Sequence, residues 1–117
     1  MTNLIIVEDN PNARRALKAL MSQQAGITVT AEASNGLEAI NTIQRQIPDL
    51  VLMDVRMPVM DGLEATKIIK QKWPQIKIVI LTMYSDCQAD VLSAGADAFL
   101  VKGCAVEEIT STIRSFN

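Results

Sequence analysis

The chain has 117 residues, of which 49% are hydrophobic and 21% are charged, and its formal net charge is −2. This length suits one domain with a single core, and this composition excludes a disordered segment. The basic residues are scattered and form no stripe that would bind nucleic acid, while no stretch approaches a signal peptide or the ~18 apolar residues of a membrane span. We therefore expect one globular domain, cytoplasmic and without a membrane partner.

The first expected strand is a continuous apolar run over 4–7. A helix should follow, because apolar residues then recur at the spacing of one helical face. These residues are Ala13, Ala16, Leu17, Leu20 and Met21. Asn10 is a suitable cap for this helix and Pro11 a suitable first residue, and Gly26 is its expected end.

A weaker strand is expected over 28–33, where threonine and valine alternate with small residues. The next helical face consists of Leu37, Ile40, Ile43 and Ile47. Asn35 is the expected cap of this second helix, and Pro48 should stop it before a third strand over 50–53.

A third helix is expected from about residue 63 to residue 73, with Asp61 as its cap and Pro74 as its stop. The apolar run over 78–81 then predicts a fourth strand, again buried on both faces.

A short fourth helix over about 85–94 should end at Gly95, and a fifth strand is expected over 99–101. The last helical face consists of Val106, Ile109, Ile113 and Phe116. Strands that alternate with helices of this length imply right-handed βαβ units, and continuous apolar runs are typical of parallel sheets. The expected fold class is therefore α/β, a (βα)5 doubly wound, five-stranded parallel sheet.

Polar side chains directly follow four of the expected strands. Glu8 and Asp9 come after the first strand, Asp54 after the third, Thr82 after the fourth and Lys102 after the fifth. In an open parallel sheet, ligands bind outside the carboxyl ends of the strands, where the strand order reverses. We therefore expect these five side chains to converge in one crevice.

Three carboxylates in one crevice resist joint ionisation unless a cation compensates them. Mg2+ suits this set because it takes oxygen ligands and keeps several waters. The chain has no histidine, and Cys87 and Cys104 lie far apart in sequence, so zinc or copper would not suit it. A carboxylate can accept a phosphoryl group as an acyl phosphate, which makes Asp54 the expected nucleophile. Lys102 would balance the phosphoryl oxygens, and the Thr82 hydroxyl would hydrogen-bond one of them.

Four segments carry a family resemblance, in the order and near the spacing of that family's motifs. They are VEDN at 7–10, MDVRMPVMDG at 53–62, LTMY at 81–84 and GADAFLVK at 95–102. Together they resemble the signature blocks of a response-regulator receiver domain, and residues 53–66 resemble the NarL/LuxR group of transcriptional regulators. The resemblance covers essentially the whole chain. It implies a flavodoxin-like or CheY-like fold and a receiver domain over 1–117.

The resemblance also implies the roles of the residues at the site. Asp54 would take the phosphoryl group from a sensor histidine kinase or from a small acyl phosphate. Asp9 and Asp54 would bind Mg2+ directly, together with the backbone carbonyl of Arg56. Glu8 would act largely through water, and Lys102 would pair with the phosphoryl group and the acidic cluster.

Thr82 and Phe99 match the hydroxyl and aromatic switch pair of the family, and switching would reshape the face around the fourth helix, fifth strand and fifth helix. Such a protein is a phosphoacceptor that assists its own phosphorylation and dephosphorylation, and is not counted as an enzyme. The resemblance is compatible with a homodimer that forms on phosphorylation. It also suggests a helix-turn-helix output domain beyond residue 117, and DNA would be bound only through that domain.

Two features depart from the family pattern. The segment between Thr82 and Lys102 is shorter than usual, so the fourth helix should be short. Gly103 follows Lys102 where many receivers carry a proline with a cis peptide bond, and a cis bond is implausible between Lys and Gly. We expect an altered loop there and an altered signalling face.

Two other classes of function fit the same scaffold. A flavin-binding redox module would need a phosphate-cradling loop rich in Gly, Ser and Thr after the first strand, and that loop is acidic here. A pseudo-receiver that binds partners without phosphorylation would lack one or more of the site residues, and all are present. Phe99 is equally compatible with a plain core position, and Arg56 and Tyr84 fit exposed loop positions as well as they fit control of water access.

Overall fold

The computed structural model describes residues 1–116. Within them five β-strands alternate with five α-helices, and one turn of 3-10 helix over Ser85–Cys87 precedes the fourth α-helix. The strands are β1 (Thr2–Val7), β2 (Ile27–Ala33), β3 (Leu50–Met53), β4 (Lys77–Thr82) and β5 (Ala98–Val101). The helices are α1 (Pro11–Ser22), α2 (Gly36–Arg45), α3 (Gly62–Lys72), α4 (Gln88–Ser93) and α5 (Val106–Arg114).

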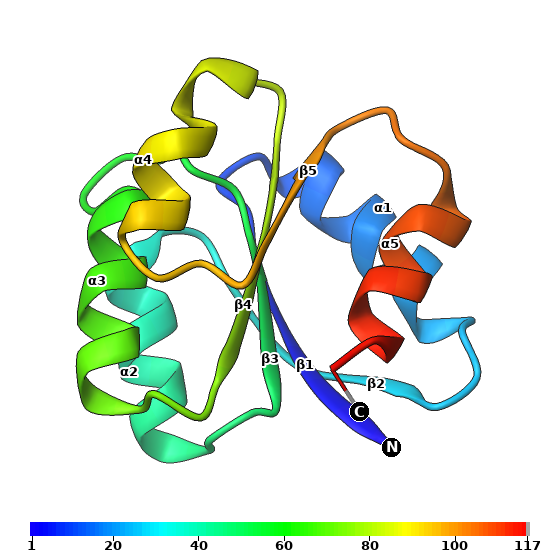
Figure 1. The fold of residues 1–117 in the computed structure, drawn as a ribbon. Coiled ribbons are helices and arrows are strands. Elements are labelled where there is room, and N and C mark those ends of the chain that lie inside the picture. Colours follow the sequence, from blue (N-terminus) through cyan, green and yellow to red (C-terminus); the bar gives the residue numbers. More distant parts are fainter. Residues whose placement is uncertain (117) are drawn as a thin grey trace.

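All strand pairs are parallel, and the order across the sheet is β2-β1-β3-β4-β5. Helices α1 and α5 cover one face of the sheet, and α2, α3 and α4 cover the other (Figure 1). The predicted (βα)5 doubly wound sheet is therefore confirmed. The strand order reverses between β1 and β3, so the ligand crevice of such a fold lies at their carboxyl ends.

The apolar runs of the sequence are continuous because the central strands are buried on both faces. In β1, Ile5 and Val7 pack into the core under α2, α3 and α4, whereas Leu4 and Ile6 pack into the core under α1 and α5. The same alternation holds along β3 and β4. Two apolar layers thus hold the sheet rigidly and leave its carboxyl edge to polar residues.

The expected N-terminal caps of three helices are confirmed. The Asn10 side chain accepts hydrogen bonds from the first backbone N–H groups of α1 at 2.9 and 3.0 Å. Asn35 and Asp61 cap α2 and α3 in the same way, each at 2.9 Å. Because each cap satisfies an otherwise unpaired donor, it fixes where its helix begins after the preceding loop.

Two helix ends lie earlier than the sequence predicts. Helix α1 ends at Ser22, and Gly26 instead lies in the following turn with a φ of +80°, where its carbonyl accepts the N–H of Thr2. Helix α2 ends at Arg45, and Ile47 lies outside it and is 54% exposed. The chain becomes extended there because a following proline disfavours helical backbone in the residue before it.

The region between β4 and α5 confirms both departures noted in the sequence. Helix α4 has only six residues, and the bond between Lys102 and Gly103 is trans, since no cis peptide occurs among the described residues. Gly103 has a φ of +97°. Proline cannot adopt this conformation because its ring fixes φ near −65°. Within residues 1–116, no helix is both long and apolar enough to cross a membrane.

Candidate functional site

The acidic residues meet at the carboxyl edge because β1 and β3 end at the same level. Val7 and Met53 are register partners in these neighbouring strands. The N–H of Asp54 donates to the carbonyl of Val7 at 3.0 Å. Glu8 and Asp54 therefore leave the sheet side by side, and both are nearly buried, with exposed fractions of 4% and 8%.

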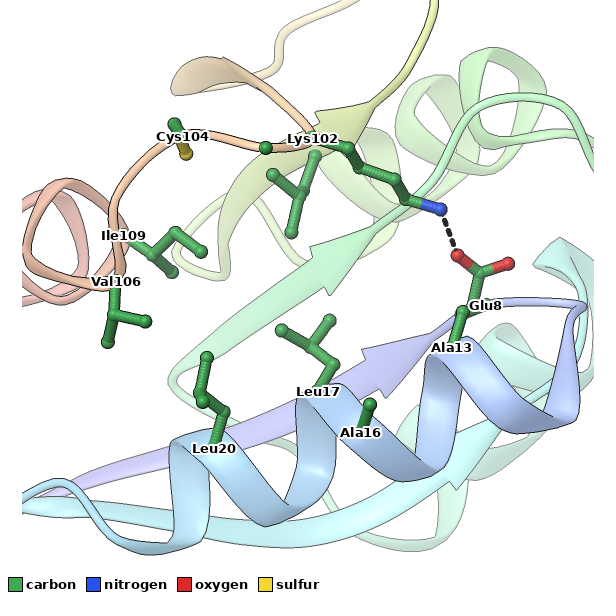
Figure 2. Close-up of a pocket in the computed structure, with 11 residues that line it drawn as sticks. Glu8, Ala13, Ala16, Leu17, Leu20, Lys102, Cys104, Val106 and Ile109 are labelled. Atoms are coloured by element: carbon green, nitrogen blue, oxygen red, sulfur yellow. Dashed lines mark hydrogen bonds and ion pairs between the residues drawn. The ribbon is translucent and has the colours of Figure 1, made fainter.

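Lys102 joins these two carboxylates from the end of β5. Its backbone N–H donates to the carbonyl of Thr82 at 2.8 Å, which extends the pairing of β5 with β4. Its Nζ donates to Asp54 Oδ2 at 2.8 Å and also to Glu8 Oε1. Figure 2 shows the Lys102 and Glu8 side chains pointing toward each other from the ends of their strands. One ammonium thus bridges two carboxylates.

The charge of Lys102 is stabilised by this arrangement. Burial alone lowers the pKa of its ammonium, but the hydrogen bonds and negative charges of Asp54 and Glu8 outweigh burial, so its pKa lies above the ordinary value. Lys102 is therefore positively charged at neutral pH. One positive charge still faces two neighbouring carboxylates and the nearby Asp9.

The three carboxylates form a donor set that fits a hard cation. Carboxylate oxygens of Glu8, Asp9 and Asp54 lie within 4.8 Å of one another. Glu8 Oε2 accepts the N–H of Asn10 at 3.0 Å, and Asp54 Oδ1 accepts the N–H of Val55 at 2.7 Å. Asp9 is exposed, so the cluster opens to solvent on one side. An all-oxygen set with an open side suits Mg2+, which keeps several waters.

Arg56 lies in the loop between β3 and α3, and its side chain joins that loop to the one after β4. Its guanidinium lies 3.7 Å from the centroid of the Tyr84 ring. Its Nη2 pairs with Asp86 Oδ2 at 3.3 Å, although both side chains are more than half exposed. Within residues 1–116, no group donates a hydrogen bond to the Arg56 carbonyl oxygen. That oxygen is available to a ligand.

Thr82 and Phe99 share one face of the sheet. Thr82 is fully buried, and its hydroxyl accepts the N–H of Tyr84 at 3.3 Å. Phe99 pairs in register with Ile80 and packs, partly buried, against the core under α2, α3 and α4. Because Thr82 lies two residues beyond Ile80, it points to the same face as Phe99. The Thr82 hydroxyl hydrogen-bonds the loop backbone, and neither Asp54 nor Lys102.

Two residues that support the site were not recognised in the sequence. Gly62 begins α3 directly against the acidic crevice: a Cβ at this position would lie 2.2 Å from the Asp54 carbonyl oxygen. The sequence indicates a part only for the neighbouring Asp61, as the cap of the third helix. The second residue is Arg14, one turn into α1, whose Nη1 donates to the carbonyl of Glu8 at 2.8 Å. Its place in the first turn after the acidic pair was the available signal.

A cavity of about 290 Å³ adjoins the site between α1 and α5. Its lining is mostly apolar and includes Leu17, Leu20 and Ile109, with Glu8 and Lys102 at one end (Figure 2). The cavity therefore borders the acidic crevice at that end, while most of its lining is apolar.

Comparisons with known proteins agree with this geometry. The family model described as response regulator receiver domain matches residues 4–114. An uncharacterized transcriptional regulatory protein, YhcZ of Bacillus subtilis, is 40% identical over 111 residues, which are 93% of this chain and 52% of that protein. The chain thus spans about half the length of the curated relatives it matches.

Solved structures show the same fold. A DNA-binding response regulator of the LuxR family from Staphylococcus aureus superposes with a TM-score of 0.93 at 31% identity, over 99% of this chain and 98% of that one. The response regulator TrrA from Thermotoga maritima, solved in complex with Mg(2+)-BeF, gives a TM-score of 0.90 at 33% identity over the whole of both chains.

The chain belongs to the response regulator receiver domain family of two-component signalling. Its relatives and structural neighbours include transcriptional regulators and response regulators of the LuxR family, which confirms the resemblance drawn from the four sequence segments.

Proposed function

We propose that Asp54 is the phosphoacceptor of this receiver domain and that the acidic crevice supports Mg2+-dependent phosphoryl transfer to it. The donor would be the phosphohistidine of a sensor histidine kinase or a small acyl phosphate. The observation that carries the proposal is the bridge from Lys102 Nζ to Asp54 and Glu8, beside the exposed carboxylate of Asp9. Such a constellation is costly unless a cation compensates its excess negative charge.

The transfer step follows from the position of Asp54. One of its carboxylate oxygens attacks phosphorus, and a P–O bond forms while the P–N bond of phosphohistidine or the P–O bond of the acyl phosphate breaks. The leaving group keeps the electron pair. Attack of water on the resulting acyl phosphate later releases inorganic phosphate and restores the carboxylate. Asp54 is thus modified and regenerated within its own domain, which is why we do not class the chain as an enzyme.

Asp9 and Asp54 are the proposed direct ligands of Mg2+, together with the backbone carbonyl of Arg56. Glu8 would act mainly through water, as the family resemblance implies, and its carboxylate oxygens accept hydrogen bonds from Lys102 and Asn10. Bound Mg2+ would supply neutralisation of the negative charge on the transferred group. The Mg(2+)-BeF complex of the Thermotoga maritima neighbour supports this choice of ion.

Lys102 would hold a phosphoryl oxygen in place of part of its present contact with Asp54. The buried Thr82 hydroxyl would turn from the Tyr84 N–H toward another phosphoryl oxygen. Phe99 lies on the same sheet face as Thr82, so its ring could then move into the space that the threonine leaves. The face formed by α4, β5 and α5 would change shape as a result. A pseudo-receiver has less support, because the full set of acceptor residues is present.

The biological output is proposed from the relatives. The name of YhcZ describes a transcriptional regulatory protein, and the chain spans about half of its length. We propose that a helix-turn-helix domain follows residue 117 in the whole protein, that DNA is bound through it, and that phosphorylation promotes a homodimer. Reading the gene beyond this position tests the first point, and a continuation without such a domain would contradict it.

The acceptor assignment can be tested by chemical mapping. The wild-type protein is incubated with acetyl phosphate and Mg2+, then treated with borohydride, which reduces an acyl phosphate to an alcohol. Peptide mass mapping should find homoserine in place of aspartate at position 54 alone. Asp49→Asn, at an aspartate before β3, is the matched control and should keep this result. Reduction at another aspartate in the wild type would show that the assignment is wrong.

A further inference from the structure

We propose that Arg14 is a positioning residue for the acidic turn after β1 and that it sets the affinity of this turn for Mg2+. This inference rests on the proposed magnesium site. Arg14 lies in helix α1, so it is not one of the polar residues that follow the strands. Its part in metal binding is therefore not indicated by that pattern.

Arg14 supports the part of the turn that leads into Asp9, whose own side chain is not held by any described neighbour. Within the described part of the chain, the Asp9 carboxylate makes no hydrogen bond or ion pair. Its position is therefore set by its backbone alone. The Glu8 carbonyl and the Asp9 N–H belong to one planar peptide unit. Arg14 Nη1 donates to that carbonyl at 2.8 Å, so it fixes the direction in which the chain reaches Asp9.

The other side of the turn is held by β2. The N–H of Glu8 donates to the carbonyl of Ala33 at 3.0 Å. Arg14 itself is anchored on the same strand, because its Nε lies 3.6 Å from Glu32 Oε1. Glu32 also pairs with Lys18 at 3.2 Å. The guanidinium thus connects α1, β2 and the acidic turn, and a planar group with several donors is suited to this task.

Position 15 offers a contrast within the same helix. Arg15 is exposed, and its side-chain contact is with Asn12 Oδ1 at 3.5 Å. It carries the same charge one residue away from Arg14 but does not touch the acidic turn. Arg15→Gln therefore reports the effect of removing one positive charge without removing the support of Glu8.

Loss of the Arg14 charge and loss of its positioning role predict opposite changes in the Mg2+ affinity of the Arg14→Gln variant. A positive charge near the carboxylates opposes the binding of a cation, so its loss alone would strengthen Mg2+ binding. Loss of positioning would weaken it, and removal of groups that orient metal ligands typically costs about 10- to 100-fold in affinity. We expect Arg14→Gln to bind Mg2+ about tenfold more weakly, and Arg15→Gln to bind it as tightly as the wild type or slightly more tightly.

Two further variants separate geometry from charge. Arg14→Lys keeps the charge but loses the planar set of several donors. We therefore expect its Mg2+ affinity to lie between that of the wild type and that of Arg14→Gln. Glu32→Gln should weaken binding through Arg14. The double variant Arg14→Gln/Glu32→Gln should then bind no more weakly than Arg14→Gln alone, because residues that act through one another are not additive.

The measurement is a Mg2+ titration of the unphosphorylated protein, followed by the amide NMR signals of the acidic turn. Phosphoryl uptake from acetyl phosphate is measured in parallel as a function of Mg2+. Arg14→Gln should raise the half-saturating Mg2+ concentration about tenfold while keeping most of the maximal rate. Urea unfolding of each variant identifies any that are unfolded, and Arg14→Lys then provides the test.

The outcomes distinguish this proposal from the proposed function. Binding by Arg14→Gln as tight as that by Arg15→Gln overturns the role of Arg14, as does additivity in the double variant. A wild-type protein that binds no Mg2+ overturns it as well. A wild-type protein that binds Mg2+ with the expected dependence on Arg14 but takes up no phosphoryl group contradicts only the proposed function.

Discussion

Among the individual residues, Lys102 carries most of the electrostatic balance of the site. Its ammonium offsets the repulsion between Glu8 and Asp54, whose carboxylates would otherwise be held together without compensation. Because these partners raise the pKa of Lys102 above its ordinary value of 10.5, the folded protein retains the proton more strongly than the unfolded chain. This difference links stability to pH.

The dependence of stability on pH predicts how the stability difference between the wild type and Lys102→Met changes with pH. The stabilisation by the charged lysine is fully present below pH 10.5 and is lost as the pH rises through the higher pKa of the folded state. We expect the wild type to be more stable than Lys102→Met at neutral pH, and the difference to shrink in strongly alkaline solution. Urea unfolding in the presence of a chelator measures it. A stability difference between the two proteins that stays constant or widens with alkaline pH would be inconsistent with the bridge from Lys102 to the two carboxylates.

A substitution at Thr82 can separate phosphoryl uptake from the conformational response of Phe99. Thr82→Val keeps the volume of the buried side chain and removes the hydroxyl that now accepts the Tyr84 N–H. We expect phosphoryl uptake to remain within about tenfold of the wild type, as one hydrogen bond is worth about 1 kcal/mol, and the NMR response of Phe99 to be largely lost. Thr110→Val, at a buried threonine of α5, is the control. A full response of Phe99 in Thr82→Val would remove Thr82 from the switch.

The strand-end rule explains which residues could be predicted. Glu8, Asp54 and Lys102 each directly follow an apolar strand, so their convergence requires only the parallel sheet. Arg14 and Gly62 act through the approach of α1 and α3 to the loops. That approach depends on how whole helices pack, and the sequence indicates it only through the place of Arg14 in the turn after the acidic pair.

At the scale of elements, the junction of β3 and α3 leaves no room for a side chain at Gly62. Gly62 N–H donates to the Val55 carbonyl at 2.7 Å, and a Cβ on Gly62 would meet the backbone of Asp54 and Val55. Backbone cannot yield as a flexible side chain can. The start of α3 is thus held directly against the loop that carries the acceptor.

Gly62→Ala should therefore displace Asp54 as well as destabilise the fold. We expect a loss of about 2–4 kcal/mol in the free energy of unfolding and a large decrease in phosphoryl uptake by the fraction that remains folded. Gly26→Ala is the control, because no atom lies within 4 Å of its added Cβ and only its φ of +80° is unfavourable. It should cost about 1 kcal/mol and leave uptake intact. Equal effects of the two substitutions would contradict the close packing at Gly62.

The elements themselves were predicted from the sequence because their signals are local. Caps at Asn10, Asn35 and Asp61 lie within three residues of the groups they bond, and all three are confirmed. The ends of α1 and α2 were placed too late, because the interpretation followed the apolar spacing and the turn residue or proline beyond it. The last helical residue of α1 lies four residues before Gly26, and that of α2 lies two residues before Ile47.

For the whole molecule, the site exists only when the sheet is assembled. Lys102 and Glu8 are 94 positions apart in sequence yet share a hydrogen bond. The reversal of strand order between β1 and β3 opens the crevice that holds them. In the proposed switch, a change at Asp54 would reach α4, β5 and α5 through the strands that end around it. The short α4 and the loop at Gly103 are where this chain's response should differ most from that of its relatives.

The central claim is that this crevice transfers a phosphoryl group to Asp54 with the help of Mg2+. Intact mass spectrometry after incubation with acetyl phosphate tests it most directly, on the wild type with Mg2+, the wild type with a chelator, and Asp54→Asn with Mg2+. The account predicts a gain of one phosphoryl group in the first sample and none in the other two. An unchanged mass of folded, Mg2+-replete wild type, or an equal gain in Asp54→Asn, would contradict it.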